Sequence, residues 1–313
     1  KEIASYETNG SVVSSPAVAN GYIYIGSGME NGTVYKLGEK GKLLDTSYNV
    51  ANGTLASYSW GDLEEETTYN WYVDVTNGIT NTVSRTWNFT TLSGLTQCRE
   101  INKPGNYILT QDITEIEGNC FNITADNVTL DGNNHKIVGD GDSNIYETGD
   151  NNGVYITGTG ISNVTIKGFK RIRGFDKGIF SSGSSSNIMS NIMIKENDLS
   201  SNNWYGVDLR YSSNSTIINN TLNSNKHGLT LRECPDTLAL DNIANFNEYY
   251  GLKLDSPETL IINNTFERNR QGMWMDHGNN EIKGNSFILN RDGIFVYEAS
   301  GNTIYNNFLN NSY

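Results

Sequence analysis

The sequence contains little of what helical proteins, nucleic-acid-binding proteins and membrane spans require. No window shows a sustained apolar period of 3.6 residues, which argues against helices and predicts an all-β chain. The net charge is −13, with 22 Lys and Arg against 35 Asp and Glu, so neither nucleic acid nor an anionic membrane is expected as a partner. No apolar run approaches the roughly 20 residues of a membrane span. No signal peptide begins at Lys1, so we expect a processed or trimmed start.

Asparagine and glycine are abundant instead. The 45 Asn and 32 Gly, against 4 Pro, favour tight turns with left-handed backbone and disfavour helices. Eleven Asn-X-Ser/Thr sequons are candidates for N-glycosylation and indicate a protein outside the cell. The sequon asparagines are Asn9, Asn31, Asn52, Asn88, Asn122, Asn127, Asn163, Asn214, Asn219, Asn263 and Asn310.

The three cysteines point to the same location. Cys98 and Cys120 flank a short segment and can close a disulfide, which leaves Cys234 over. Three buried thiols are the alternative. We favour the disulfide, and with it an oxidising, extracellular compartment.

One pattern repeats through the C-terminal two thirds of the chain. Each unit opens on a glycine and carries two asparagines five residues apart with an apolar residue between them. The glycines are Gly153, Gly178, Gly206, Gly228, Gly251, Gly272 and Gly293. The first asparagines are Asn197, Asn220, Asn242, Asn264, Asn285 and Asn306, and the second are Asn202, Asn225, Asn247, Asn269, Asn290 and Asn311. The apolar residues are Leu199, Leu222, Ala244, Phe266, Phe287 and Phe308. Concurrent columns of this kind indicate a repeat architecture.

The repeat predicts stacked β-coils. A unit such as Gly206–His227 holds three short apolar stretches, "VDL", "TII" and "NTLN", separated by turns. Three short strands make one triangular coil of about 21–25 residues, and successive coils stack in parallel at roughly 4.8 Å. Inward asparagines then bond to the asparagine of the next coil and to turn backbone.

These residues resemble the NosD-like family of right-handed, single-stranded parallel β-helices, which is common in archaeal surface-layer and other extracellular proteins. The resemblance covers about 190 residues and implies a fold rather than a function. "CREINKPGNYILTQDI" (Cys98–Ile113), followed by "CFNITADNVTLDGNNHKIVG" (Cys120–Gly139), is similar to the opening segment of archaeal β-helix surface proteins. We therefore expect an N-terminal cap over 98–120, pinned to the first coil by the disulfide.

Residues 1–94 differ in kind from the β-helix predicted for 95–313. Leu63–Thr91 places Tyr69, Trp71, Val73 and Val75 at alternate positions on one face and ends in "WNFTT", resembling the last two strands of a fibronectin type III module. We predict one β-sandwich over 1–94, which includes a short hinge at its end, Ser93–Gly94.

A second resemblance in the same region leaves an alternative open. Ser11–Leu37 is similar to one blade of a PQQ-type β-propeller. A single blade cannot close a ring, so the resemblance does not support cofactor binding. The alternative organisation is a blade-like segment over 1–40 and a partial sandwich over 41–94.

One outward face of the predicted β-helix carries charged side chains. Alternate residues of the strand after each glycine point outward. On this outward face the stacking of coils would bring together Arg210, Arg232, Lys253, Asp255 and Asp276. The candidates for carbohydrate binding beside them are Asp208, Trp274, Phe295 and Tyr297. Asp255 and Asp276 would form the acid/base pair of a polysaccharide lyase or glycoside hydrolase, a class in which aromatic residues stack on sugars. The alternative is a self-satisfied charge ladder in which Arg232 pairs with Asp255. The ladder predicts no turnover, and from the sequence we favour it.

The stretch "MWMDH" offers Met273, Met275 and His277 at alternating positions, which suits Cu(I). Some NosD-like proteins are associated with copper. Met273 and Met275 align with Leu252 and Leu254 of the preceding coil, so we predict that they belong to the core.

A calcium site is the other metal hypothesis. Asp140, Asp142 and Asn144 begin like a calcium loop, but Asn151 stands where the closing Glu belongs. We therefore predict an acidic turn and no cofactor, with calcium as the weaker alternative.

Three functions compete. The leading hypothesis is a non-enzymatic structural or adhesive glycoprotein of the cell surface. The last coil, Gly293–Tyr313, has no polar cap, so either the protein continues beyond it or the coil binds copies of the chain or other surface proteins. The second hypothesis is a lyase or glycoside hydrolase acting on an acidic polysaccharide. The third is a copper-handling protein.

Overall fold

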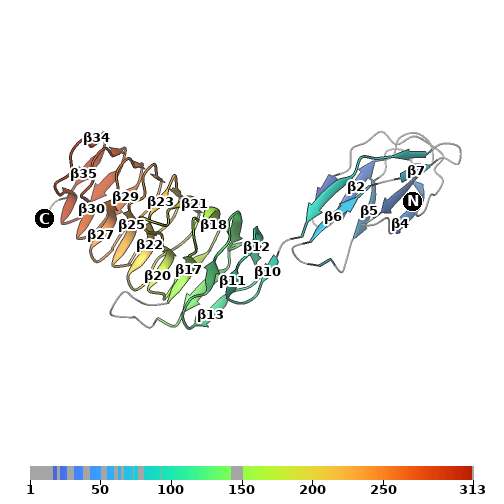
Figure 1. Cartoon of the computed structure of the whole chain (residues 1–313), viewed down its shortest axis with the longest axis horizontal. Helices are drawn as coiled ribbons and strands as arrows, with labels where there is room; N and C mark the ends of the chain where they lie inside the picture. Colours follow the sequence, from blue (N-terminus) through green and yellow to red (C-terminus); the bar gives the residue numbers. More distant parts are fainter. Residues whose placement is uncertain are drawn as a thin grey trace. The chain divides into compact units, whose positions relative to one another are not determined.

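A computed structural model gives the structure of the 313-residue chain. The chain divides into two compact units, Lys1–Leu92 and Ser93–Tyr313 (Figure 1). The structure describes residues 17–19, 22–26, 32–37, 43–50, 55–59, 63–64, 67–72, 74–76, 81–91, 93–141 and 151–311. Within these residues no helix is long and apolar enough to cross a membrane.

In the first unit the described strands pair antiparallel. One sheet has the order β1 (Ala17–Ala19), β2 (Tyr22–Gly26), β5 (Leu55–Ser59). The other pairs are β3 (Gly32–Leu37) with β4 (Leu43–Val50), β6 (Thr68–Trp71) with β9 (Trp87–Thr90), and β7 (Asp74–Thr76) with β8 (Asn81–Val83). Trp71 is buried and stacks on Trp87 with ring centroids 4.8 Å apart. The fibronectin-like sandwich and the blade-like stretch 11–37 fall largely outside the described residues and stay predictions.

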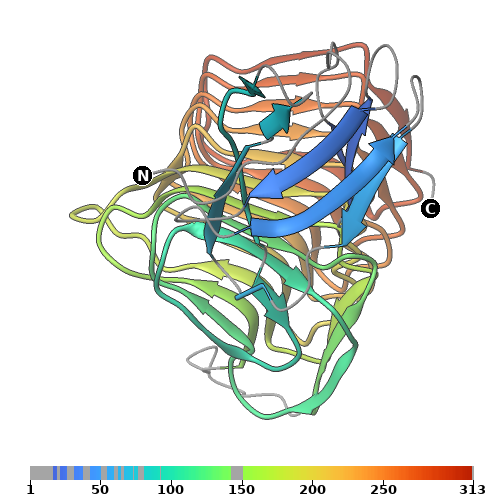
Figure 2. The same ribbon diagram turned by 90° about the vertical axis from the view of Figure 1, so that its right-hand side faces the viewer.

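The second unit is a right-handed parallel β-helix, as its repeats predict, and its coils stack along one axis (Figures 1 and 2). The first long sheet runs β10 (Ser93–Leu95), β12 (Gly105–Leu109), β15 (Val128–Asp131), β18 (Ser162–Lys167), β21 (Met189–Lys195), β24 (Thr216–Ile218), β26 (Leu238–Leu240), β28 (Leu260–Ile262), β31 (Glu281–Lys283), β34 (Thr303–Tyr305), with β23 (Ser212–Ser213) beside β21. The second runs β11 (Arg99–Ile101), β14 (Phe121–Ile123), β17 (Asn152–Ile156), β20 (Lys177–Ser181), β22 (Tyr205–Arg210), β25 (His227–Arg232), β27 (Tyr250–Asp255), β30 (Gln271–Met275), β33 (Asp292–Val296). Two short sheets complete the coils: β13 (Ile113–Ile116), β16 (Lys136–Gly139), β19 (Arg171–Arg173), and β29 (Thr265–Glu267), β32 (Ser286–Ile288), β35 (Phe308–Asn310).

The boundary between the units lies slightly earlier than the sequence indicates. Ser93 and Gly94, predicted as a hinge, belong to β10, which pairs in parallel with β12. The segment 98–120 contributes β11, β12 and β13 to three sheets. It is therefore the first coil of the β-helix rather than a separate cap, because its backbone already pairs with the coil that follows.

The two asparagine ladders connect the coils through the interior. In the first ladder each side-chain amide donates to the next side-chain oxygen at 3.0 Å, through Asn197, Asn220, Asn242, Asn264, Asn285 and Asn307. The second ladder runs through Asn202, Asn225, Asn247, Asn269, Asn290 and Asn311. The ladders are thus confirmed except in the last coil, where the first ladder uses Asn307 instead of Asn306 and Leu309 instead of Phe308 pairs with Phe287. The two ladder asparagines of that coil, Asn307 and Asn311, are four positions apart instead of five, so the first ladder residue lies one position later than the repeat predicts.

The glycine column is required by the close approach of successive strands. A Cβ at Gly251 would lie 2.6 Å from the carbonyl oxygen of Gly272 and 2.7 Å from Cδ1 of Phe266. No side chain fits at such distances, so the strand spacing itself selects glycine.

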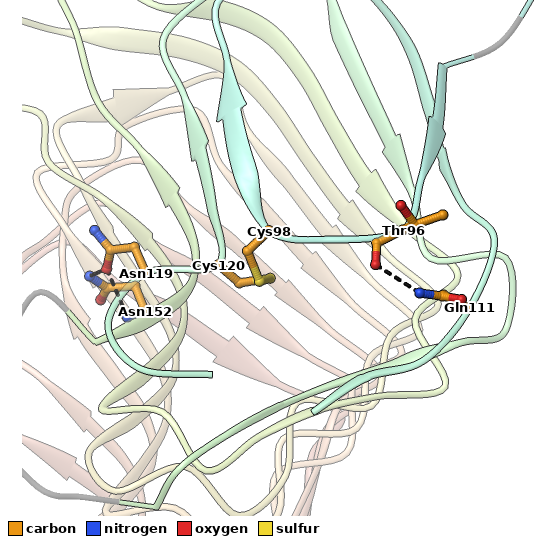
Figure 3. Close-up of a disulfide and its surroundings, with 6 residues drawn as sticks. All are labelled: Thr96, Cys98, Gln111, Asn119, Cys120 and Asn152. Carbon is orange, nitrogen blue, oxygen red and sulfur yellow. Dashed lines mark hydrogen bonds between the residues drawn. A yellow bond between two sulfur atoms is a disulfide. The ribbon is translucent and has the colours of Figure 1, made fainter. Parts of the chain in front are cut away.

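Cys98 and Cys120 precede the neighbouring strands β11 and β14 and are joined by a disulfide, with their Cα atoms 4.5 Å apart (Figure 3). Near it, Gln111 Nε2 donates to the carbonyl oxygen of Thr96 at 2.9 Å. Cys234 is a free thiol in the core. Burial raises the pKa of the Cys234 thiol to about 12, so this group is unreactive in the folded protein.

Thiol counting checks this assignment. The denatured but unreduced protein is expected to show one reactive thiol, Cys234, and finding three would exclude the disulfide. Its loss is expected to lower the free energy of unfolding by about 3 kcal/mol, because the bond closes a loop of intermediate length in the unfolded chain. Denaturation with and without Cys98→Ser/Cys120→Ser measures the difference.

Candidate functional site

The outward residues of the second long sheet stack in the predicted columns. One column, read off the strand register, is Tyr155, Phe180, Asp208, Thr230, Lys253, Trp274 and Phe295. In the neighbouring column Arg210 pairs with Arg232, and Arg232 pairs with Asp255. We call the outward side of β22, β25, β27 and β30, with the residues that flank these strands, the outward face.

A buried carboxylate organises the two arginines. Asp208 has no exposed side-chain surface although it lies in an outward column, because longer side chains cover it. Arg210 Nη2 donates to Asp208 Oδ2 at 2.8 Å, and Arg232 Nε lies 3.5 Å from Asp208 Oδ1. Arg232 also donates to the hydroxyl of Tyr205 at 2.9 Å. The predicted pairing of Arg232 with Asp255 is therefore wrong: the arginine turns toward the buried carboxylate, where the dielectric is lower and attraction stronger.

Asp255 and Asp276 converge on an imidazole. His277 Nδ1 lies 3.2 Å from Asp255 Oδ1 and 3.1 Å from Asp276 Oδ1. His277 Nε2 lies 3.9 Å from an oxygen of Glu233, and about a third of the His277 side chain is exposed. The sequence indicates His277 only as a candidate copper ligand. The signal for its position beside the carboxylates is that it directly follows Asp276, just past the end of β30.

The pKa values of Asp255 and His277 are both raised above their usual values. Burial, followed by the charge of Asp276, raises the pKa of Asp255 against the opposing effect of Lys253. Burial alone would lower the pKa of His277, but the hydrogen bond and charge of Asp276, with Asp255 and Glu233, outweigh it and raise that pKa.

Aromatic rings and cations alternate beside this cluster. His227 stacks on Tyr205 with ring centroids 4.8 Å apart, and its centroid lies 5.0 Å from that of Tyr250. The ammonium of Lys253 lies 4.9 Å from the ring centroid of Trp274. At the edge of the outward face, the ammonium of Lys226 lies 3.4 Å from the ring centroid of Trp204.

Three cations lie close enough to His227 to affect its titration. Burial, followed by the charges of Lys253, Arg232 and Lys226, lowers the pKa of His227 to about 3. Its imidazole is therefore neutral at physiological pH, and cations surround it although the whole protein has a net charge of −13.

The other predicted residues lie apart from the cluster. Phe295 continues the column of Trp274 and Tyr297 lies beyond it, and both are exposed. Asp140 accepts a hydrogen bond of 3.4 Å from Asn151, whereas Asp142 and Asn144 lie outside the described residues.

The sequons differ in their surroundings. Asn163 donates to Asn127, Asn191 to Asn163 and Asn214 to Asn191, which ties three sequons into one exposed amide ladder. Asn88, Asn219, Asn263 and Asn310 are also exposed, whereas Asn122 is half-buried. Asn9, Asn31 and Asn52 lie outside the described residues.

The fold and this face define the class: a parallel β-helix protein with a charged, aromatic outward face. Residues 140–313 match the family model described as "Periplasmic copper-binding protein (NosD)". The matched segment is more than half of the chain, which therefore belongs to the NosD family. No curated protein matches the chain.

Several solved structures are similar to the chain. The A-module of the mannuronan C-5 epimerase AlgE6 from Azotobacter vinelandii is 19% identical, with a TM-score of 0.46, over 70% of this chain and 57% of that chain. The periplasmic alginate epimerase AlgG is 16% identical, with a TM-score of 0.45, over 74% of this chain and 70% of that chain. The chain thus spans less than two thirds of the AlgE6 module. Similarity this distant does not extend to the chemistry of a site.

The described residues do not fit a Cu(I) site. Met273 and Met275 are fully buried core residues, as predicted, and Cys234 is buried as well. Asp255, Asp276 and His277 offer ligand atoms within 4.8 Å of one another. Carboxylate oxygens with one imidazole suit harder cations, whereas Cu(I) prefers thiolate and thioether donors.

Proposed function

We propose that the protein acts outside the cytoplasm and binds an acidic polysaccharide along the outward face. The observation that carries this proposal is the setting of His227: Lys226, Arg232 and Lys253 surround a neutral imidazole on a strongly acidic protein. Cations gathered at one place on a surface attract an anionic ligand.

Aromatic residues supply the second component of recognition. Trp274 and Tyr250, half-exposed with ring centroids 6.2 Å apart, present apolar surfaces on which sugar rings can pack. Lys253 and Arg232 lie next to them and can pair with uronate carboxylates. Four stacked coils span roughly 14 Å along the helix axis, which suits a linear chain better than a compact ligand.

The disulfide and the family description support a location outside the cytoplasm. Structural disulfides persist in oxidising compartments, and the NosD family model is described as periplasmic. An adhesive role at the cell surface is compatible with this binding, and self-assembly and glycosylation stay predictions.

Binding experiments with matched variants test the proposal. The protein is expected to bind polygalacturonate or alginate but not neutral dextran, and added salt is expected to weaken the binding because it screens exposed charges. Lys253→Gln is expected to weaken it about fivefold, since an exposed charge-assisted contact contributes on the order of 1 kcal/mol. Lys195→Gln removes the same charge from β21, on the other long sheet, and is the control.

Titration calorimetry measures both variants under the same conditions. Equal weakening by Lys253→Gln and Lys195→Gln would show that the polysaccharide does not bind the outward face. Absence of any binding to acidic polysaccharides would exclude the proposed function.

A further inference from the structure

The carboxylates of the outward face have two different kinds of partner. Asp208 pairs with the guanidinium groups of Arg210 and Arg232, whereas Asp255 and Asp276 both contact the imidazole of His277. The self-satisfied ladder favoured from the sequence would have paired Asp255 with Arg232. The observed division instead leaves a half-exposed group of two carboxylates and one imidazole beside Lys253 and Trp274.

The carboxylates fix the orientation of the imidazole. His277 Nδ1 faces an oxygen of each aspartate within hydrogen-bonding distance, so Nδ1 carries the proton of the neutral ring. Nε2 then holds the lone pair, and its distance of 3.9 Å from Glu233 is too long for a hydrogen bond. A base oriented by a carboxylate on its other nitrogen is the arrangement on which proton-transfer enzymes rely.

The two aspartates lie close together and both face the imidazole. Their nearest ligand oxygens are within 4.8 Å of each other, and one oxygen of each lies within 3.2 Å of His277 Nδ1. A glycosidase pair acts on a sugar or water held between its two carboxyl groups. Here both carboxylates contact His277 instead, and this arrangement favours proton transfer through His277.

We propose that the outward face cleaves the acidic polysaccharide it binds by β-elimination, with His277 as the catalytic base and Asp255 and Asp276 as positioning residues. The inference rests on the proposed function, because Lys253 must hold the uronate carboxylate next to His277. Its cationic charge stabilises the negative charge that develops on that carboxylate.

The reaction balances without a further reactant. His277 Nε2 takes the proton from the carbon next to the carboxylate, and that electron pair forms a double bond to the neighbouring ring carbon. The glycosidic bond at this second carbon breaks, and its electrons go to the departing oxygen. The imidazolium returns the proton to that oxygen, which leaves one unsaturated uronate end and one ordinary chain end.

Separate measurements of binding and turnover test the inference. The full chain, incubated with polygalacturonate or alginate, is expected to release unsaturated uronate that absorbs in the ultraviolet. His277→Gln is expected to lower this rate about 100- to 10,000-fold, the usual contribution of a general base, while polysaccharide affinity changes by less than about twofold. Glu258→Gln, an exposed carboxylate on the turn after β27, is the control and should retain the rate.

The outcomes distinguish failure of the proposed cleavage from failure of the proposed binding. Binding without unsaturated product, release of reducing ends without unsaturation, or full activity of His277→Gln overturns the inference and leaves the proposed function standing. Absence of binding overturns both.

The pH dependence of the cleavage rate distinguishes a positioning role of Asp276 from a purely structural one. The base acts when deprotonated, and Asp276 raises the pKa of His277, so the rate should rise with pH through that raised pKa. Asp276→Asn is expected to lower kcat and to move this limb to lower pH. An unchanged profile in Asp276→Asn would exclude the positioning role.

Discussion

Replacing Asn264 by alanine is expected to lower the free energy of unfolding of the β-helix by on the order of 4 kcal/mol, since several buried polar groups lose their partners. The Asn264 side chain accepts from the backbone N–H of Asn242 at 2.9 Å and from its amide at 3.0 Å. Its own amide donates to the carbonyl oxygens of Ala239 at 2.9 Å and Ile262 at 3.0 Å, and to Asn285 at 3.0 Å. Alanine removes all five bonds and leaves a cavity.

Two further variants sharpen this prediction. Asn264→Asp keeps the shape but replaces the amide donors with an ionisable oxygen, so it is expected to destabilise at least as much as alanine. Asn310→Ala, at an exposed asparagine outside both ladders, should change stability by less than about 0.5 kcal/mol. Denaturant unfolding measures all three, and an Asn264→Asp protein as stable as the parent would show that the amide donors do not stabilise the coil.

The sequence predicts the coil fold well because the same constraints recur in each repeat. Columns of Gly, Asn and apolar residues reveal both the strand register and the inward direction, which the pairing of Lys253 with Trp274 confirms. The sequence pattern assigns the register of the last coil one residue too early, because Asn306 and Asn307 are adjacent and both fit the pattern. Only the hydrogen bond from Asn285 identifies Asn307 as the ladder residue.

The candidate site could be predicted only in part. Register identifies which residues share the outward face, so Asp255 and Asp276 are found from spacing alone. Register does not give the direction of a long side chain, and Arg232 turns to the buried Asp208 rather than along the column. His277 lies past the end of β30, outside the two-residue alternation of the strand, so no periodic pattern places it beside the carboxylates.

Lowering the pH from 7 to 5 is expected to remove about 2 kcal/mol of stability through His227 alone. In the folded protein, burial and the cations Lys253, Arg232 and Lys226 lower the pKa of His227 to about 3, whereas an unfolded histidine titrates near 6.5. The unfolded chain therefore binds one proton more than the folded chain between these values. Protonation of His227 therefore does not lower the free energy of unfolding above about pH 6.5. Below that pH the free energy of unfolding falls by about 1.4 kcal/mol for each pH unit, down to about pH 3.

The matched variant is His227→Phe, which keeps an aromatic ring between Tyr205 and Tyr250 but cannot take up a proton. Denaturant unfolding at pH 7 and pH 5 is expected to show an acid loss that is smaller by about 2 kcal/mol in His227→Phe than in the parent protein. Equal acid sensitivity of His227→Phe and the parent would exclude the buried, cation-surrounded imidazole as its source. An acidic polysaccharide on the outward face would offset the charges of Lys253 and Arg232, so its binding is expected to raise the pKa of His227 and to reduce the acid loss.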